Sequence, residues 1–355
     1  MVMRAAVFKE KGEPFEIEEV DEPEPEEDEV VVETEASGIC RSDWHVWQGD
    51  WHWIGVFPME GQIFGHEPAG TVVEVGEEVE NVEEGDQVTV PFNMSDGTCP
   101  YCRAGMSNIC DNIQPLGFLP NVQGAWAEKF KVPNADQNAV VLPEGVEPLD
   151  VAGLGCRFAT SFHGIVHRAE VEPGDWVAVH GCGGIGLSAV HIADAIGANV
   201  IAVDLEDRKL EFAEELGAVE TVNAKEEDSP GNRAAAIAGG SCDVAIDALG
   251  IEVTCRNAMQ SLGKRGTQLQ LGLTTGEEEG EIPLPVDEIV FGERDFVGSF
   301  GMQPHRFDEI FRMMESGKLE PSRIIGEEVA LDDVPEVLDS MSEFETIGFP
   351  VITEF

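Results

Sequence analysis

The stretch WVAVHGCGGIGLSAVHIADAIGANVIAVD, residues 176–204, decides the fold of this chain. Its two apolar ends are typical of buried strands, and the residues between them have the apolar spacing of a helix. Before that helix, Gly181, Gly183 and Gly186 have the spacing G-x-G-x-x-G. Such glycines allow a tight turn and let a pyrophosphate approach the helix N-terminus. The stretch therefore predicts a βαβ unit that binds a dinucleotide, with a glycine-rich surface turn as the alternative.

The end of the second strand indicates which dinucleotide is bound. Asp204 lies eighteen residues after Gly186, where a carboxylate accepts hydrogen bonds from the adenosine ribose and repels a 2′-phosphate. We therefore expect NAD to be preferred over NADP. If NADP were preferred, the basic Arg208 or Lys209 would be the expected reason.

Strands and helices continue to alternate beyond this unit. The apolar runs CDVAIDALG and TQLQLGL are separated by a helical stretch that ends in glycine, which is typical of a parallel sheet covered on both faces. Upstream, short runs such as VVVETEA and GTVVEVG alternate with Gly, Pro and acidic turns, which predicts a β domain. We expect an α/β protein with a Rossmann doubly wound parallel sheet at 157–300, and a β domain formed by 1–156 and completed by 301–355.

The composition is strongly acidic, with 70 Asp and Glu against 21 Lys and Arg in 355 residues and a net charge of -49. A nucleic-acid binder would be basic, so this class is excluded. Disorder is another usual source of such charge, but 42% hydrophobic residues in regular runs argue for packed cores. The acidity is expected to form a solvated coat of the kind found in halophiles, with a role in solubility alone as the alternative.

The N-terminal residues and the cysteines indicate the compartment. MVMRAAVFKEKGEP lacks the apolar region of a signal peptide, and the apolar run at 176–193 contains Gly and His residues that favour a strand, turn and helix over a membrane span. We expect a cytoplasmic protein with no membrane partner. Eight Cys in such a chain are expected to be metal ligands or buried thiols rather than disulfides.

Residues far apart in the sequence form the first candidate metal site. Cys40 lies in GICRSDWH, His66 precedes Glu67 in GHE, and Cys156 lies in GLGCRFAT near the expected domain boundary. Two thiolates and one imidazole bind zinc and leave the fourth position open for water or substrate. Taken singly, such residues are more often buried or incidental, and this alternative stays open.

A second candidate metal site lies within one short loop. In DGTCPYCRAGMSNIC, Cys99, Cys102 and Cys110 lie close together among Pro and Gly residues. Closed structural zinc sites have four ligands. Asp96, three residues before Cys99, is the expected fourth ligand. The alternative is a loop with three thiols and no metal.

Together these motifs resemble the zinc-dependent medium-chain alcohol dehydrogenases over nearly the whole chain. The matching runs occur in the family's order: CRSD at 40–43 with His45, GHEPAGTVVEVG at 65–76, the Cys loop, GCRFAT at 155–160 and HGCGGIG at 180–186. Two Cys and one His are themselves a ligand set known from alcohol dehydrogenases, so the zinc assignment rests on this resemblance as well as on residue types. The resemblance implies a GroES-like β-barrel catalytic domain beside the Rossmann domain.

The same resemblance implies a reaction and its metal ligands. Cys40, His66 and Cys156 resemble the catalytic zinc ligands, with Glu67 as an alternate ligand or a supporting group. Zinc lowers the pKa of a bound alcohol. A hydride then passes from the substrate carbon to the nicotinamide, which gives an aldehyde or ketone.

The resemblance to the family also implies roles for further individual residues. Ser42 and His45 resemble the proton relay, and Asp43 resembles the partner of His66. The expected cofactor contacts are Arg41, Thr160, Gly181, Cys182, Gly183, Gly184, Ile185, Gly186, Asp204, Lys209, Leu271, Gly272, Leu273 and Ser299.

Two positions depart from the family's pattern. Asp96 stands where the structural zinc site commonly has its first Cys. Phe349 follows Gly348 where the family often has an Arg that contacts the pyrophosphate. We expect the first departure to weaken or remove the structural zinc, and the second to remove one cofactor contact.

Several alternatives remain at this level. A polyol, sugar or threonine dehydrogenase would show nearly the same motifs, and a nucleotide-binding protein without turnover is the alternative outside the enzymes. The expected partners are a small alcohol or aldehyde and further copies of the chain in a dimer or tetramer. Cys182, Cys242 and Cys255 are expected to be buried thiols. Four Trp are expected either to line an aromatic substrate cleft or to belong to the core: Trp44, Trp47, Trp51 and Trp53.

Overall fold

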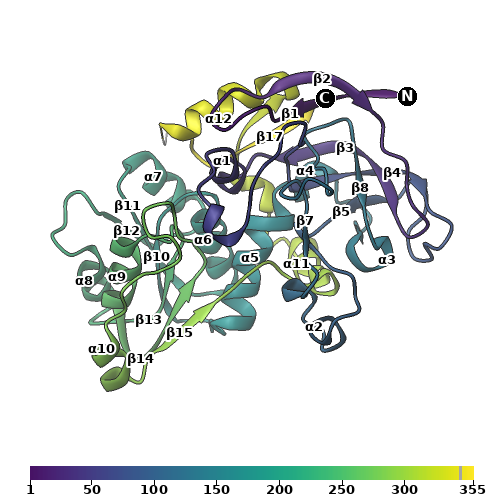
Figure 1. The fold of residues 1–355 in the computed structure, drawn as a ribbon. Coiled ribbons are helices and arrows are strands. Elements are labelled where there is room, and N and C mark those ends of the chain that lie inside the picture. The colour runs from purple at the N-terminus through teal and green to yellow at the C-terminus, as the bar shows by residue number, and fades with distance from the viewer. Residues whose placement is uncertain (344–345) are drawn as a thin grey trace. The chain divides into compact units, whose positions relative to one another are not determined.

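The computed structural model describes residues 1–343 and 346–355 (Figure 1). It contains two compact units, one formed by residues 1–159 and 301–355 and the other by residues 160–300. Within the described residues, no helix has the length and apolar character needed to cross a lipid bilayer.

The unit at 160–300 is built on a parallel sheet. Its strands lie in the order β12-β11-β10-β13-β14-β15, and each neighbouring pair is parallel. The chain runs outward from β10 to β12 and then crosses to the other side of β10, so the strand order reverses between β10 and β13. The predicted doubly wound sheet is confirmed. Its strands are β10 Trp176–His180, β11 Asn199–Asp204, β12 Glu220–Asn223, β13 Cys242–Asp247, β14 Leu262–Gln270 and β15 Asp295–Gly298.

Helices connect these strands. Helix α6 packs on α7, and α8 packs on α9, as expected for the two layers that cover a doubly wound sheet. Apolar side chains of the strands and of α9, including Ile201, Ala245 and Met259, form one buried cluster. The connecting helices are α6 Gly184–Ile196, α7 Asp207–Glu215, α8 Pro230–Ile237, α9 Glu252–Ser261 and α10 Val286–Gly292, and α5 Ala159–Phe162 precedes β10.

Glycine is required at two positions of the turn between β10 and α6. Gly181 has a φ of 99°, in the left-handed region. A Cβ on Gly186 would lie 1.7 Å from the carbonyl oxygen of Gly181. The turn therefore closes tightly only with glycine at these positions, which is why the sequence pattern predicts it.

The other unit is a β domain that uses both ends of the chain. Its main sheet has the order β16-β17-β3-β4-β5-β9, with β8 also paired to β3. The C-terminal β17 is parallel to β16 and antiparallel to β3. The strands are β1 Val2–Val7, β2 Glu16–Asp21, β3 Val30–Gly38, β4 Glu67–Val75, β5 Gln87–Thr89, β6 Asn93–Met94, β7 Gln114–Pro115, β8 Lys129–Val132, β9 Val140–Val141, β16 Ile325–Ala330 and β17 Phe349–Glu354.

The helices of this unit are short near the N-terminus and longer near the C-terminus. Apolar side chains from both ends of the chain form a buried cluster that includes the fully buried Trp126 and Phe64. The helices are α1 Arg41–Trp47, α2 Pro100–Arg103, α3 Ala135–Asn138, α4 Pro148–Val151, the π-helical turn η3 Leu154–Phe158, α11 Phe307–Glu315 and α12 Val334–Ser342.

Of the four Trp near α1, two belong to the buried core and two pack against it. Trp47 and Trp51 are buried members of the apolar cluster of this unit, and Trp44 and Trp53 are partly buried and pack against it. The hypothesis of an aromatic-lined substrate cleft is therefore wrong for Trp47 and Trp51.

Candidate active site

The first candidate metal site lies where two core strands end. Gly38 at the end of β3 pairs with Glu67 at the start of β4, which brings Cys40 close to His66. Cys156 enters from η3, where the amide of Phe92 donates to the carbonyl of Gly155 over 3.1 Å. One donor atom from each of Cys40, His66, Glu67 and Cys156 lies within 4.8 Å of the others, and all four residues are buried.

The imidazole of His66 is oriented by Asp43. Its Nδ1 lies 2.9 Å from Asp43 Oδ1, and the Asp43 carboxylate also accepts from the Cys40 amide over 2.9 Å. Among the described residues, the buried His66 Nε2 has no hydrogen-bond partner. A buried nitrogen lone pair without a partner is costly unless a metal or a water binds it. The orphaned Nε2 beside two thiols fits a zinc ion.

The charges of this cluster are strongly coupled. A hydrogen bond from the Cys156 thiol, against the opposing effect of burial, holds the pKa of Cys40 well below its ordinary value. The same hydrogen bond and burial raise the pKa of Cys156. Burial disfavours the charged form of His66, but Asp43 and the Cys40 thiolate outweigh it and raise the pKa of the imidazole. Without metal, Cys40 therefore loses its proton more readily than Cys156, and a dication would favour the thiolate form of both.

Arg157 is a functional candidate that sequence reasoning missed. Its guanidinium is buried and forms an ion pair with Glu67, the residue after His66. The only signal was its place directly after Cys156 in GCRFAT, because its partner lies 90 residues away. Glu67 is thus a member of the candidate ligand group and also the partner of a buried cation.

Helix α1 places Ser42 and His45 three residues apart on the same side. His45 Nδ1 lies 2.8 Å from Asp50 Oδ2, and the imidazole stacks on Trp51. The hydrogen bond from His45 lowers the pKa of Asp50 against the effect of burial. Asp50 was not predicted as a site residue. It holds the His45 ring in one orientation.

Arg41, an expected cofactor contact, is partly tied to its own unit. Its guanidinium lies 3.8 Å from the centre of the Trp44 ring and donates to the carbonyl of Met341. Burial lowers its pKa to about 10.

The second candidate metal site is also assembled. One donor atom from each of Asp96, Cys99, Cys102 and Cys110 lies within 4.8 Å of the others. Cys99 Sγ lies 3.5 Å from Cys102 Sγ, and Cys110 Sγ lies 3.3 Å from Asp96 Oδ1. Asp96 also accepts from the Thr98 amide and hydroxyl and from the Asn112 side chain. Three sulfurs and one carboxylate oxygen fit a tetrahedral zinc ion.

The turn between β10 and α6 is tied to Asp204 at the end of β11. Asp204 accepts from the amide of Cys182 over 2.7 Å and from the amides of Leu205 and Glu206 over 2.7 and 3.0 Å. These bonds fix the carboxylate beside the glycine-rich turn, which contains Gly183, Gly184 and Ile185. Lys209 lies in the first turn of α7.

The remaining expected cofactor contacts lie at the carboxyl ends of β14 and β15. Leu271 and Gly272 follow β14, and Leu273 is about half exposed. The Ser299 hydroxyl, after β15, donates to the carbonyl of Thr160 over 3.0 Å.

Asp247, at the end of β13, is a second residue that sequence reasoning missed. It is fully buried and accepts from the amides of Leu249 and Gly250 and from the Thr254 and Gln270 side chains. Burial raises its pKa against these hydrogen bonds. Its carboxylate orders the loop after β13. Cys182, Cys242 and Cys255 are buried free thiols, as predicted.

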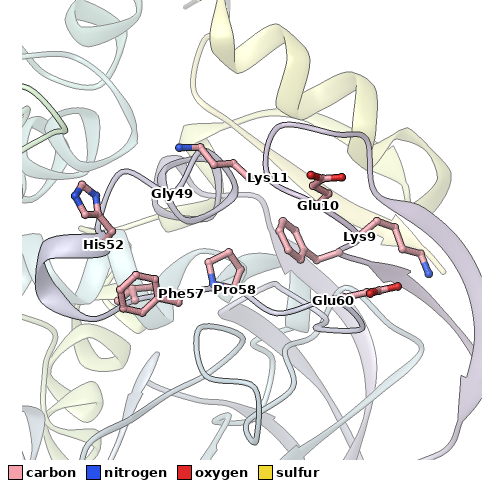
Figure 2. A pocket seen from close by; sticks show the side chains of 10 residues that line it. Lys9, Glu10, Lys11, Gly49, His52, Phe57, Pro58 and Glu60 are labelled. Atoms are coloured by element: carbon pink, nitrogen blue, oxygen red, sulfur yellow. The ribbon is translucent and has the colours of Figure 1, made fainter.

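A cavity of about 440 Å³ lies in the β domain (Figure 2). In this view His52 lies at one end of the lining residues, and Lys9 and Glu60 lie at the other. The first candidate metal site and the four Trp are absent from its described lining, which is Phe8, Lys9, Glu10, Lys11, Gly49, His52, Val56, Phe57, Pro58 and Glu60.

Two protein-family models match the chain, one in each part. Residues 26–144 match the alcohol dehydrogenase GroES-like domain, and residues 184–316 match the zinc-binding dehydrogenase domain. The predicted GroES-like domain is therefore confirmed beside the Rossmann sheet.

Relatives and solved structures cover nearly the entire chain. An alcohol dehydrogenase of Moraxella sp. is 34% identical over 99% of both chains, and an NAD-dependent alcohol dehydrogenase of Sulfurisphaera tokodaii is 31% identical over 99% of both. A D-arabinose 1-dehydrogenase (NADP(+)) of Saccharolobus solfataricus is 32% identical over 99% of this chain and 97% of its own. The structure of the alcohol dehydrogenase TADH from Thermus sp. ATN1 superposes with a TM-score of 0.90 at 29% identity over 99% of this chain and 100% of its own. This chain belongs to the zinc-type alcohol dehydrogenase family.

Proposed function

We propose that this protein is a zinc-dependent alcohol dehydrogenase that transfers a hydride between an alcohol and NAD. The observation that carries the proposal is the buried group of Cys40, His66 and Cys156 with the orphaned His66 Nε2. These three residues would hold the catalytic zinc. When bound there, zinc acts as a Lewis acid that lowers the pKa of the alcohol hydroxyl.

Ser42 and His45 would move the proton that the alcohol loses. The Ser42 hydroxyl would accept the proton on the substrate side while giving up its own, and His45 would take up the released proton and pass it to solvent. Asp50 holds the proton on His45 Nδ1 and leaves Nε2 to exchange. Asp43 fixes the ring of His66 through Nδ1, so that Nε2 faces the thiols.

Unit 160–300 would bind NAD at the switch between β10 and β13. The turn at 181–186 would receive the pyrophosphate at the start of α6. The Asp204 carboxylate, fixed by three backbone amides, would bind the adenosine ribose and oppose a 2′-phosphate. Thr160, Leu271, Gly272, Leu273 and Ser299 would line the nicotinamide side, with Lys209 at the ribose and Arg41 at the pyrophosphate.

The second cluster would hold a structural zinc through Asp96, Cys99, Cys102 and Cys110. Asp96 Oδ1 lies 3.3 Å from Cys110 Sγ and 4.0 Å from Cys102 Sγ. This oxygen therefore faces the thiols and supplies the fourth ligand in place of a Cys.

A substrate panel tests the proposed function. Primary and secondary alcohols, polyols and aldose sugars are assayed with NAD and with NADP, and zinc content is measured on the same sample. We expect the highest kcat/KM with an alcohol and NAD. Replacement of Asp204 with Ser should lower the ratio of kcat/KM with NAD to kcat/KM with NADP. A higher kcat/KM with a sugar and NADP would favour the activity named for the D-arabinose relative.

The acidic coat would adapt the protein to molar salt. Spread over a surface of 15273 Å², 70 acidic residues lie on average about 15 Å apart, close to the Debye length of about 10 Å in 0.1 M salt. Few cations compensate them, so repulsion opposes the compact state in dilute buffer. We expect the melting temperature to rise steeply between about 0.1 and 3 M KCl. A flat profile would leave the acidic coat a role in solubility alone.

A homo-oligomer would use the edge of the parallel sheet. In the described sheet, β15 is a terminal strand, and Phe296 on it is 39% exposed. The neighbouring Val290 and Phe291 on α10 are 65% and 81% exposed. Exposed strand edges with apolar neighbours favour pairing between copies. Light scattering should show a dimer or larger assembly that Phe291→Glu weakens. A monomeric wild-type chain would show that this surface is not an interface between copies.

A further inference from the structure

Glu67 lies at a point where two interactions compete for its carboxylate. It follows His66 directly, is fully buried, and has an oxygen within 4.8 Å of the donor atoms of Cys40, His66 and Cys156. Carboxylate oxygens are ordinary zinc ligands. A buried carboxylate without a cationic partner would therefore move onto a zinc ion and fill its fourth position.

Arg157 holds this carboxylate through several donors. Its Nε lies 3.0 and 2.9 Å from the two carboxylate oxygens of Glu67, Nη2 donates to Oε2, and the Arg157 amide donates to Oε1 over 3.0 Å. Both oxygens are thus engaged by Arg157. A planar guanidinium fixes a carboxylate in this way, whereas an ammonium group supplies a single point of contact.

The guanidinium is itself locked in place. Nη2 also donates to the carbonyl of Ile39 over 3.0 Å, and Cζ lies 3.9 Å from the centre of the Phe349 ring. Only 3% of Arg157 is exposed, and Phe349 is also buried. Arg157 therefore cannot follow Glu67 toward the thiols without breaking contacts to β17 and to the segment before Cys40.

We propose that Arg157 is a positioning residue that keeps Glu67 off the catalytic metal and so reserves the fourth coordination position for the substrate oxygen. The inference rests on the proposed function, because it assumes a metal at Cys40, His66 and Cys156. It explains why a carboxylate can lie within the ligand group without closing the site.

The test uses the full chain with zinc replaced by Co²⁺, and imidazole as a probe for the open coordination position. The Co²⁺ absorption bands are followed during imidazole titration, with Cys40→Ala protein as the reference for the second metal site. Wild type should show bands that imidazole shifts. In R157M, Glu67 should occupy the position and weaken imidazole binding at least about tenfold. The double variant R157M/E67Q should regain the wild-type response, because the amide that replaces the carboxylate carries no charge to draw it to the metal.

The outcomes separate the two claims. If Cys40→Ala leaves the Co²⁺ spectrum unchanged, the proposed metal site fails. If that variant loses the thiolate bands but R157M binds imidazole as wild type does, only the role of Arg157 is overturned. Should R157M fail to fold, R157K carries the test, because its ammonium leaves one Glu67 oxygen free. Imidazole affinity should then fall in R157K and recover in R157K/E67Q, and an unchanged affinity in R157K would again overturn the proposal.

Discussion

The two candidate metal sites use similar residues but are held in place in different ways. The residues of the first site come from the ends of β3 and β4 and from η3, and the exposure of Cys40, His66, Glu67 and Cys156 is between 0% and 7%. The residues of the second site come from one loop at 96–110, where Tyr101, Met106 and Ile109 are each at least 40% exposed. The first site is thus built into a core, whereas the second lies in a loop with little core of its own.

This difference predicts a chemical role for a metal in the first site and a stabilising role for a metal in the second. Packing already brings the first group together, so a metal there adds Lewis acidity more than structure. In the second group, the energy of metal binding is also energy for ordering the loop. Loss of the first metal should therefore abolish turnover in a folded protein, and loss of the second should lower stability in an active one.

The largest expected effect is that of Cys40→Ala. It removes one thiolate from the proposed catalytic site, and we expect kcat to fall more than about a hundredfold, with one zinc ion lost per chain and a nearly unchanged melting temperature. Cys242→Ala, at a buried thiol outside both sites, is the matched control and should keep the zinc and the activity. A fully active Cys40→Ala protein with the zinc content of the wild type would show that Cys40 is not a ligand of a catalytic zinc.

The residues that support the ligands give a second contrast. Asp43→Asn removes the charge that orients His66, and we expect zinc affinity and kcat to fall about 10- to 100-fold. Asn112→Ala removes a comparable hydrogen bond to Asp96 in the second site and should leave kcat unchanged. Steady-state kinetics and competition with a chelator measure both. Equal losses of kcat in the two variants would mean that the sites are not functionally distinct.

A smaller effect is expected for Asp96→Ala. Without its fourth ligand the loop should lose zinc, and the melting temperature should fall by at least about 3 °C, equivalent to roughly 2 kcal/mol in a protein of this size. The kcat should stay near that of wild type. Calorimetry and zinc analysis test this prediction. If the wild type itself contains a single zinc ion and melts as the variant does, the second site does not hold metal.

The sequence predicts the ligands of both sites because residue type and order carry that information. Thiols and an imidazole are the usual zinc ligands, and the glycine spacing before α6 is a backbone requirement that only glycine meets. The apolar periodicity likewise predicts the parallel sheet, since buried strands must be apolar over their length.

The partners of those ligands are harder to predict. Arg157 and Glu67 are 90 residues apart, and nothing in either local sequence shows that β4 and η3 bring them together. The partners of Asp247 are equally hard to predict, because they come from a loop and from β14. For Trp47 and Trp51, the spacing in an irregular loop does not show which way a side chain points, so the sequence alone favours neither the core nor the cleft.

The smallest effect concerns the pH at which the second site becomes reactive without metal. The Cys102 amide, 3.4 Å from Cys99 Sγ, is the main cause that lowers the pKa of Cys99 to about 7, and burial raises the pKa of Cys110 to about 12. Thiolates react and thiols do not. In zinc-free protein, alkylation of Cys99 by iodoacetamide should therefore increase through a midpoint near pH 7 as the pH rises, while Cys110 stays slow.

Mass spectrometry of peptides labelled at each pH measures this contrast, and the same thiols in denaturant supply the reference midpoint. Zinc should protect Cys99 and Cys110 together, since a bound thiolate is no longer free to attack. If Cys99 and Cys110 share one midpoint near the denatured value, the folded loop does not distinguish its thiols before metal binds. The second site would then be ordered by zinc alone, and its contrast with the first would be greater than the structure indicates.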